Sequence, residues 1–444
     1  MTKNLTEGKP LSVLFFFALP MLLGNIFQQF YNLADSVIVG NFVGSDALAA
    51  VGGTFPISFL AIAIATGAST GCSIVISHAF GAENNKKVSR AITTSLILVS
   101  FLGLIIMLLS LIFLKPLLVL LGTPSDIFNA SYSYLKIIFW GCIFIYIYNC
   151  LTAIFNALGD SKTPLKFLIV STILNVGLDL IFVLCFKMGS DGAGYATLIS
   201  QAAATIGLFI YFLIKMKYII SKEKQPLFDK TLVKEMIKYA IPSIIQQTIV
   251  SLGMMTVQGL VNSYGKDFVA GYSAATKIDA IAVMPMINIS LALSTFTAQN
   301  VGAKKMDRVN KGFNAAMLMC VVASVLCTCV LVLFGKFFVG MFVDSDASMQ
   351  VINYGNDYFK VVSLFYILLA VMFCSNGVHR GLGNMKIFMF STFCNITARI
   401  TLAYALKPLL GYTAIFWALP IGWLVSGSIS FIYFKSGKWK RRFE

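Results

Sequence analysis

Long apolar runs, separated by short polar gaps, recur along the chain from Leu11 to Phe434. A helix needs roughly 20 apolar residues to cross the hydrocarbon core of a bilayer, whereas the strands of a membrane β-barrel are about ten residues long and alternate in polarity. The runs here are continuous, and only 12% of the 444 residues are charged. Soluble domains carry roughly 25% charged residues. The sequence therefore predicts an all-α membrane protein with about twelve transmembrane helices.

Basic residues gather in alternate polar gaps. Both termini and every second gap together hold 25 of the 34 Lys and Arg residues, whereas the intervening gaps hold only five. This positive-inside pattern predicts that both termini are cytoplasmic in a bacterial plasma membrane, the cell inner membrane. The net charge of +16 is then explained by topology and by contact with anionic lipid, so we expect no nucleic-acid partner.

The sequence repeats on either side of residues 215–238. Six short matches occur in the same order at an offset of 220 to 224 residues. Examples are Ala18-Leu19-Pro20 with Ala240-Ile241-Pro242, Tyr134-Leu135-Lys136 with Tyr358-Phe359-Lys360, and Leu158-Gly159-Asp160 with Leu382-Gly383-Asn384. We predict an N-terminal lobe of six helices over residues 1–214, a cytoplasmic linker over 215–238, and a C-terminal lobe of six helices over 239–444. Parallel repeats of this kind enclose a central cavity and alternate access to it.

Two acids fall inside apolar spans of the first half, Asp35 and Asp179. A charge at the centre of a membrane helix costs about 2.5–3.5 kcal/mol on insertion scales, so such residues are functional hypotheses by default. Asp35 follows Tyr31 by one helical turn, Asp179 follows Asn175 by one turn, and Thr197 lies in the next span. Their oxygen atoms suit Na⁺, and two neighbouring carboxyls suit a proton. The alternative is that each acid lies near the end of its span, where its carboxyl only contacts water at the membrane surface.

The second half keeps the repeat but lacks both acids, since Asp35 aligns with Thr256 or Val257 and Asp179 aligns with Arg399. Any ion coupling is therefore expected in the first half. A cavity for a lipophilic cation would use amide, thioether and carboxylate side chains. The candidates are Gln28, Asn32, Gln247, Met255, Gln258 and Asp279. The alternative is that the methionines pack between helices and that Asp279 pairs with Lys277 or Arg399.

Pro20 and Pro242 interrupt equivalent spans, and a proline removes one backbone hydrogen bond and kinks a helix. A hinge at Pro20 would move Asp35, whereas static packing is the alternative. No phosphate-binding loop appears, and the two histidines, His78 and His379, lie at loop edges. We therefore expect neither an enzyme nor a cofactor, and no metal other than Na⁺ at the ion site.

Several motifs follow one another in a fixed order. They are Ala18-Leu19-Pro20, Asp35-Ser36, Phe80-Gly81-Ala82, Ala157-Leu158-Gly159-Asp160, Asn175 to Asp179, and Gly192 to Thr197. In order and spacing they resemble the multidrug and toxic compound extrusion (MATE) family over nearly the whole chain. The resemblance implies two six-helix lobes around a central cavity, and export of organic cations or drugs driven by H⁺ or Na⁺. It also implies an ion site with these members: Asp35, Asn175, Asp179 and Thr197, supported by Tyr31 and Asn149.

The sequence and the resemblance together predict a secondary antiporter that exports cationic or lipophilic drugs by alternating access. We expect it to work as a monomer in the lipid bilayer, without an obligate protein partner. One alternative is a flippase for a lipid-linked oligosaccharide, whose cavity needs several basic residues to bind pyrophosphate. Arg399 and Lys277 are the basic residues that fall inside spans. The other alternative, a membrane-embedded enzyme or a non-transporting scaffold, predicts a catalytic constellation that the sequence does not contain.

Overall fold

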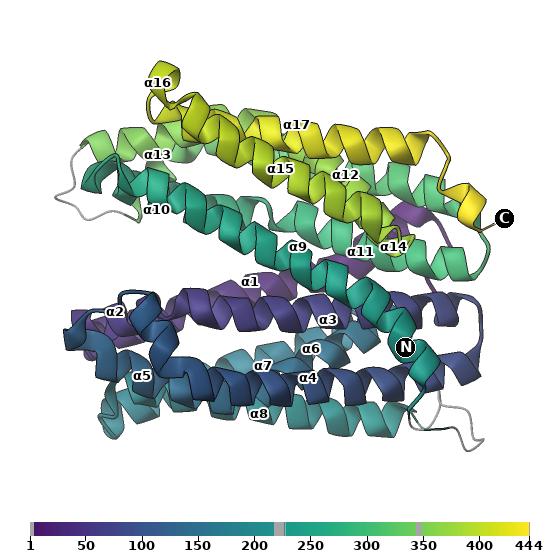
Figure 1. The fold of residues 1–444 in the computed structure, drawn as a ribbon, viewed down its shortest axis with the longest axis horizontal. Helices are drawn as coiled ribbons and strands as arrows, with labels where there is room; N and C mark the ends of the chain where they lie inside the picture. The colour runs from purple at the N-terminus through teal and green to yellow at the C-terminus, as the bar shows by residue number, and fades with distance from the viewer. Residues whose placement is uncertain (1–3, 217–225, 227, 343–348, 444) are drawn as a thin grey trace. The chain divides into compact units, whose positions relative to one another are not determined.

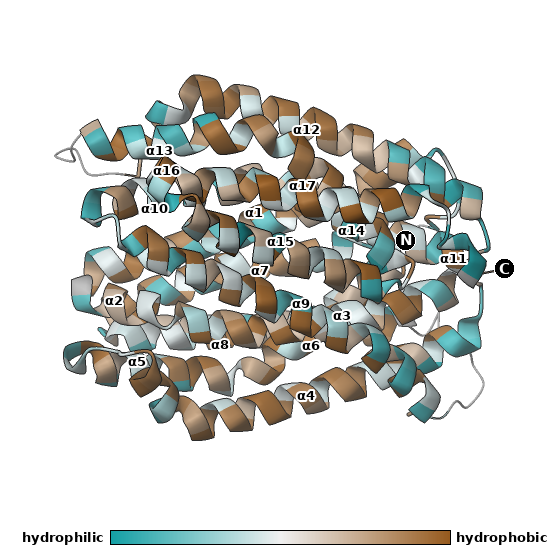
Figure 2. Ribbon diagram, turned by 45° about the horizontal axis from the view of Figure 1, so that its top comes forward, coloured by the Kyte–Doolittle hydropathy of each residue, from teal (hydrophilic) through white to brown (hydrophobic). Residues whose placement is uncertain are grey.

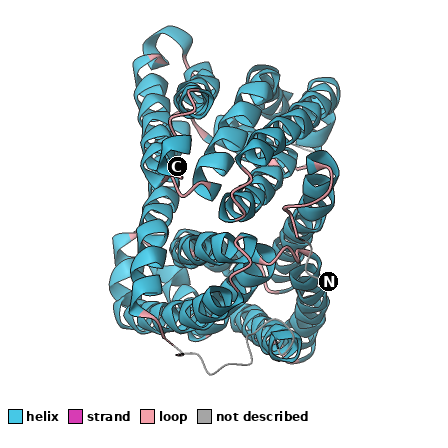
Figure 3. Cartoon of the chain, turned by 90° about the vertical axis from the view of Figure 1, so that its right-hand side faces the viewer, coloured by secondary structure: helices cyan, strands magenta, loops and turns pink. Residues whose placement is uncertain are grey.

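The computed structural model describes residues 4–216, 226, 228–342 and 349–443. All regular structure within these ranges is helical, and they contain no strand (Figure 3). The predicted all-α class is confirmed. Residues 217–225 and 227 of the predicted linker lie outside the described residues.

The first half contains α1 (Pro10–Phe42), α2 (Ser45–Gly53), α3 (Phe55–Gly81), α4 (Asn85–Leu120), α5 (Ser125–Trp140), α6 (Cys142–Ala157), α7 (Lys162–Asp179), the π-helix η1 (Leu180–Cys185) and α8 (Gly189–Met216).

The second half repeats this order of helices (Figure 1). Within the described residues, ten helical segments are long and apolar enough to cross a membrane, and the pair α5 and α6, bent by 46°, makes an eleventh. The 21-residue helix α15, which contains Arg399, is not among these apolar segments. The second half contains α9 (Lys230–Asn262), α10 (Lys266–Ala282), α11 (Met284–Gly302), α12 (Met306–Gly340), α13 (Met349–Val362), the 3₁₀ turn η2 (Ser363–Phe365), α14 (Tyr366–Gly381), α15 (Met385–Ala405), α16 (Lys407–Leu410), α17 (Thr413–Lys435) and η3 (Lys440–Arg442).

The two longest helices, α4 and α12, carry apolar side chains on their outer faces. Figure 2 shows hydrophobic residues along both helices and hydrophilic residues where each begins. Phe101 on α4 is 61% exposed, and Leu333 on α12 is 74% exposed. Such a surface is unfavourable in water and matches the hydrocarbon of a bilayer. The chain is therefore a multi-pass membrane protein.

Several spans are interrupted, and the interruptions place polar groups. The break at Thr54 separates α2 from α3, and the break at Val283 separates α10 from α11; each following helix has a proline at one of its first two positions. There the missing N–H of proline removes no helical hydrogen bond. The span that begins with α7 continues as a π-helix directly after Asp179, a feature often found at functional sites. The 3₁₀ turn η2 lies directly before Tyr366.

The chain divides into two compact units whose boundaries differ from the predicted lobes. Unit 1 contains residues 23–244, and unit 2 contains residues 4–22 and 245–444. The first part of α1 thus belongs to unit 2, and the first part of α9 belongs to unit 1. Each division lies two residues after a helix proline, at Pro20 and at Pro242. The physical reason is that both helices continue through the proline, so one helix serves two cores.

Each exchanged segment is packed tightly in its unit. In unit 2, Leu14, Phe17 and Ala18 of α1 belong to the same buried cluster as Phe296 of α11. In unit 1, α9 approaches two small positions of α3 one turn apart. A Cβ atom added to Gly71 would lie 2.4 Å from the backbone nitrogen of Ala240. Close approach of membrane helices at small residues spaced by four is a recurrent mode of packing.

Candidate functional site

Unit 1 encloses two neighbouring carboxyl groups. Asp35 projects from α1 and is 8% exposed, and Asp179 is the last residue of α7 and is fully buried. The two carboxyls lie within electrostatic reach of each other. No other described group donates a hydrogen bond to either oxygen of Asp179 or to Oδ1 of Asp35. Since ionised carboxylates only accept hydrogen bonds, a proton or a cation is needed to make two such neighbouring buried groups favourable.

Hydroxyl groups surround the acid pair. The Tyr31 hydroxyl lies 3.0 Å from the Thr197 Oγ1 atom of α8, and Tyr31 is close enough to act electrostatically on both acids. Tyr134 of α5 also lies within electrostatic reach of Asp35, Asp179 and Tyr31. We call these five residues the first-unit acid site. Gly192 and Gly194, which precede Thr197 in the sequence, lie inside α8.

Tyr134 was not among the residues predicted for the site. It lies about a hundred residues away from Asp35 in the sequence, and only folding brings α5 against α1. A signal was nevertheless present, because Tyr134 belongs to a repeated tripeptide whose counterpart begins at Tyr358. A buried tyrosine that recurs at the same place in both halves marks a common polar position.

Asn175 lies one helical turn before Asp179 on α7. It is fully buried, and neither its amide oxygen nor its amide nitrogen has a hydrogen-bond partner among the described atoms. Leaving a buried polar group unsatisfied costs about 1–3 kcal/mol. Asn175 therefore provides an unused donor and an unused acceptor beside the acid pair, where a bound ion or water could take them up.

Three other predicted residues of the first half lie differently. Asn149 of α6 donates a 2.8 Å hydrogen bond to the Ile145 carbonyl of its own helix, and no described contact joins it to the acid site. Gln28 and Asn32 are exposed, whereas Asp35 on the same helix is buried. The polar residues of α1 are thus divided between a buried face and an exposed face.

The candidates of the second half are also divided. Met255 and Gln258 are exposed on α9, with Gln258 Nε2 donating to Asn262 Oδ1 at 3.0 Å, and Gln247 is half-buried. Asp279 instead points into unit 2 and accepts a hydrogen bond from the Tyr366 hydroxyl. Arg399 lies within electrostatic reach of this carboxyl, and Lys277 is exposed. Neither cation forms a direct ion pair with Asp279 among the described residues.

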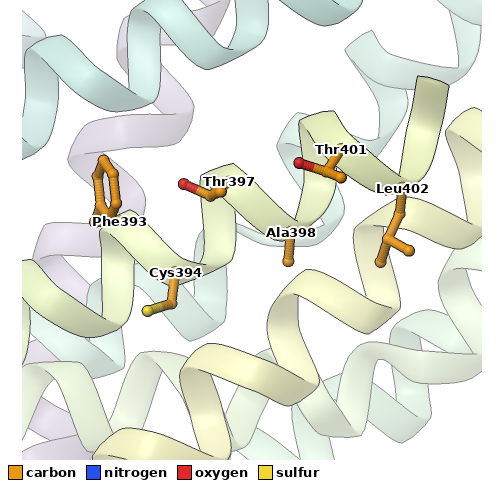
Figure 4. Close-up of a pocket in the computed structure, with 6 residues that line it drawn as sticks. All are labelled: Phe393, Cys394, Thr397, Ala398, Thr401 and Leu402. Atoms are coloured by element: carbon orange, nitrogen blue, oxygen red, sulfur yellow. The ribbon is translucent and has the colours of Figure 1, made fainter. Parts of the chain in front are cut away.

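A hollow of about 450 Å³ lies along α15 (Figure 4). Its lining residues are Phe393, Cys394, Thr397, Ala398, Thr401 and Leu402. They include no charged side chain, so we assign no ion site there. Within the described residues, no three His, Cys, Asp or Glu side chains are placed to hold a metal ion together. The oxygen atoms of the first-unit acid site are therefore the candidate ligands for a cation.

Two helical repeats made of apolar membrane segments, with a pair of buried carboxyls among hydroxyl groups, define a multi-pass membrane protein of the secondary-transporter class. The sequence profile of the family described as MatE matches residues 20–181 and 242–405, one stretch in each half. The chain belongs to this family. The members of the family are transporters and not enzymes, as the sequence led us to expect.

Similar proteins cover nearly the whole chain. The probable multidrug resistance protein YpnP of Bacillus subtilis is 28% identical over 440 residues, which cover 98% of this chain and 97% of that protein. The probable multidrug resistance protein NorM of Thermotoga maritima is 25% identical over 441 residues, covering 96% and 92%. A crystal structure of a MATE protein matches the fold with a TM-score of 0.92 at 22% identity, over 100% of this chain and 99% of that chain. The predicted family and two-lobe fold are confirmed.

Proposed function

We propose that this protein is a secondary antiporter that exports cationic or lipophilic drugs in exchange for H⁺ or Na⁺. The observation that carries the proposal is the pair of buried acids Asp35 and Asp179, which have no ion-pair partner among the described residues and lie within electrostatic reach of each other. Such a pair needs a proton or a cation to be favourable. The names of the relatives YpnP and NorM, both probable multidrug resistance proteins, support drugs as the substrate class. The antiporter needs no cofactor.

The mechanism that we propose is alternating access controlled by the charge of the first-unit acid site. An ion that enters from outside binds at Asp35 and Asp179 and removes their mutual repulsion. The last two turns of α1 then change their position relative to the segment before Pro20, because a helix proline is a point of weak backbone bonding. Coupling follows if the ion binds the two conformations with different affinity. The conformation that binds the ion more tightly then binds the drug more weakly.

The oxygen atoms of the site are compatible with both ions. A proton needs only the two carboxyls, whereas Na⁺ needs several oxygen ligands. Thr197, Tyr31 and the unpaired Asn175 amide carry further oxygen atoms that could serve as such ligands. We further propose that the protein works as a monomer in the plasma membrane with both termini in the cytoplasm.

The proposal is tested by ethidium uptake into inverted vesicles under an imposed proton gradient or an imposed sodium gradient. We expect one gradient to drive uptake by the wild type, and the gradient that does so identifies the ion. The Asp35→Asn variant should lose at least about 90% of this uptake, because a neutral amide neither takes up a proton nor balances the charge of Na⁺. The control is Asp126→Asn, which changes an exposed acid at the start of α5.

Two outcomes would contradict the proposal. If neither gradient moves ethidium although the wild type is folded, drug export is the wrong function, and a lipid-linked substrate becomes the alternative. If Asp35→Asn transports as well as Asp126→Asn, the coupling site lies elsewhere.

A further inference from the structure

Residues 4–9, directly before α1, are held by the turn between α11 and α12. They belong to unit 2. Leu5 is fully buried in the main hydrophobic cluster of that unit, and Thr6 is 6% exposed, whereas the next three residues are exposed. A terminal segment is usually poorly ordered unless specific contacts hold it. The contacts of this segment therefore indicate a defined position on unit 2.

Two amide side chains in the last turn of α11 hold the backbone of Leu5. The Leu5 N–H donates to Gln299 Oε1 at 3.0 Å, and the Leu5 carbonyl accepts a hydrogen bond from Asn300 Nδ2 at 3.3 Å. Both amide side chains are fully buried, and a buried polar group that loses a partner is costly. The segment thus supplies hydrogen bonds to polar groups inside unit 2.

Two basic side chains bind the same segment. Lys305, the last residue of the turn, donates to the Thr6 carbonyl at 3.1 Å and to the Thr6 hydroxyl at 3.2 Å. Arg308, in the first turn of α12, donates to the Leu5 carbonyl at 3.3 Å and to the Glu7 carbonyl. Hydrogen bonds from charged donors are about twice as strong as those between neutral groups. The α11–α12 turn is therefore a receptor for this stretch of backbone.

The equivalent turn of unit 1, between α3 and α4, also holds a helix beginning. Both turns contain a residue with a positive φ, Glu83 at 56° and Lys304 at 57°. In the repeat Lys87 corresponds to Arg308, and it pairs with Glu235 near the start of α9 at 3.0 Å. That ion pair is partly exposed, and exposed ion pairs contribute little. The contact in unit 2 is the more buried of the two.

We propose that residues 4–9 are a strap that fixes the first part of α1 on unit 2, so that in transport α1 moves only beyond Pro20. The statement about transport rests on the proposed antiport, whereas the fixation does not. α1 is one continuous helix, and its remainder belongs to unit 1. If the start of this helix could slide, a movement near Asp35 would shift the whole helix. A fixed start converts the movement into a bend at the proline.

Hydrogen–deuterium exchange of the full-length protein in detergent tests the fixation without transport. We expect slow exchange of an N-terminal peptide that includes Leu5 in the wild type, because the Leu5 N–H is bonded to Gln299. The double variant Lys305→Met/Arg308→Met keeps apolar length but lacks both charged donors. Its N-terminal peptide should exchange at least about tenfold faster, since the segment then opens locally.

The matched control is Lys311→Met, which removes an exposed cation three residues after Arg308 and should exchange like the wild type. Exchange within α3 is the internal control for general unfolding. The strap is overturned if the N-terminal peptide of the double variant exchanges like that of the wild type, or if α3 accelerates by the same factor. Should the double variant fail to accumulate, Arg308→Met alone decides by the same criteria.

Covalent fixation tests the role in transport. The variant Thr6→Cys/Lys305→Cys lacks the Lys305 contact, and we expect its ethidium uptake in inverted vesicles to fall at least about threefold. A short bismaleimide that joins the two cysteines should restore uptake, because the strap stays fixed throughout the cycle. Wild type treated with the same reagent controls for reaction of the native cysteines.

Two outcomes overturn this role. Uptake equal to the wild type without the cross-link would show that fixation is not needed, and an inactive cross-linked variant would show that the strap must detach. If no gradient drives uptake even in the wild type, the antiport proposal fails, and with it the role of the strap in transport. The exchange measurements still decide the fixation, so the two failures are distinguishable.

Discussion

A single acid in the turn between α6 and α7 shows how local contacts fix an ionised side chain. Asp160 accepts a 3.1 Å hydrogen bond from the Thr163 backbone nitrogen and a 2.8 Å bond from the Thr163 hydroxyl, and it pairs with Lys215 at the end of α8. Burial alone would raise the pKa of this carboxyl, but Lys215 and Thr163 outweigh burial, so its pKa is lowered from the ordinary value of 3.8. Asp160 therefore ties two helix ends together in its ionised form.

We expect Asp160→Asn to lower the melting temperature at neutral pH, because a hydrogen-bonded charge contributes about 1.5–3 kcal/mol. The folded pKa lies below the unfolded pKa, so this stability is fully present above about pH 4 and is lost as the pH falls through the folded value. In melting curves recorded from pH 7 to pH 3, the difference in melting temperature between the wild type and the variant should shrink as the pH falls. A constant difference across this range would contradict the assignment.

At the scale of elements, the packing of α9 on α3 depends on the absence of side chains. Gly67 and Gly71 lie one turn apart on α3, and added Cβ atoms would come within 2.8 Å of Ile244 and 2.4 Å of Ala240, in each case against backbone atoms. Backbone cannot move aside as a flexible side chain can. The first part of α9 is therefore held in unit 1 by a contact that tolerates only glycine.

We predict that Gly71→Ala destabilises the protein by about 1–3 kcal/mol, the usual cost of overpacking. The control is Gly52→Ala in α2, where an added Cβ meets nothing within 4 Å. Alanine is favoured over glycine in a helix by about 1 kcal/mol, so the control should be neutral or more stable. Thermal unfolding in detergent measures both, and equal behaviour of the two variants would show that the α3–α9 contact is not tight.

At the scale of the whole molecule, each half of the sequence completes the core of the other unit. Leu5 of the N-terminal segment donates its backbone N–H to Gln299 Oε1 at 3.0 Å, and Lys305 donates to the Thr6 carbonyl at 3.1 Å. In unit 1, Lys87 of α4 pairs with Glu235 of α9 at 3.0 Å. Neither sequence half therefore contains all the residues of a complete unit.

We predict that a chain divided between residues 220 and 221 is stable only when both fragments are produced together. Each fragment alone lacks one exchanged segment and exposes the surface that this segment covers, so it should be degraded or aggregate. When both are produced, an affinity tag on the first fragment should recover the second at a near-equal amount. Stable, monodisperse fragments that do not co-purify would show that the exchanged segments are dispensable.

The sequence predicted much more of the membrane topology than of the tertiary contacts. Apolar runs and charge placement identify spans because both reflect the bilayer, which acts on every residue locally. Asp35 and Asp179 were recognised for the same reason, since charge inside a span is costly wherever it occurs. Tyr134 was missed because its relation to Asp35 exists only after α5 packs beside α1. The exchange at Pro20 was missed as well, since a helix passing from one core to another has no local signature.

The division of α1 after Pro20 also has a consequence for the order in which the protein is made. Residues 4–22 leave the ribosome before the rest of unit 2, since the other residues of that unit are all made after Ile244. Unit 1, by contrast, contains nothing synthesised after residue 244. During translation the first part of α1 must therefore wait in the membrane without its final neighbours until the second half has been inserted. Unit 1 can assemble while the chain is still growing, and unit 2 is completed last, when the oldest segment meets the newest.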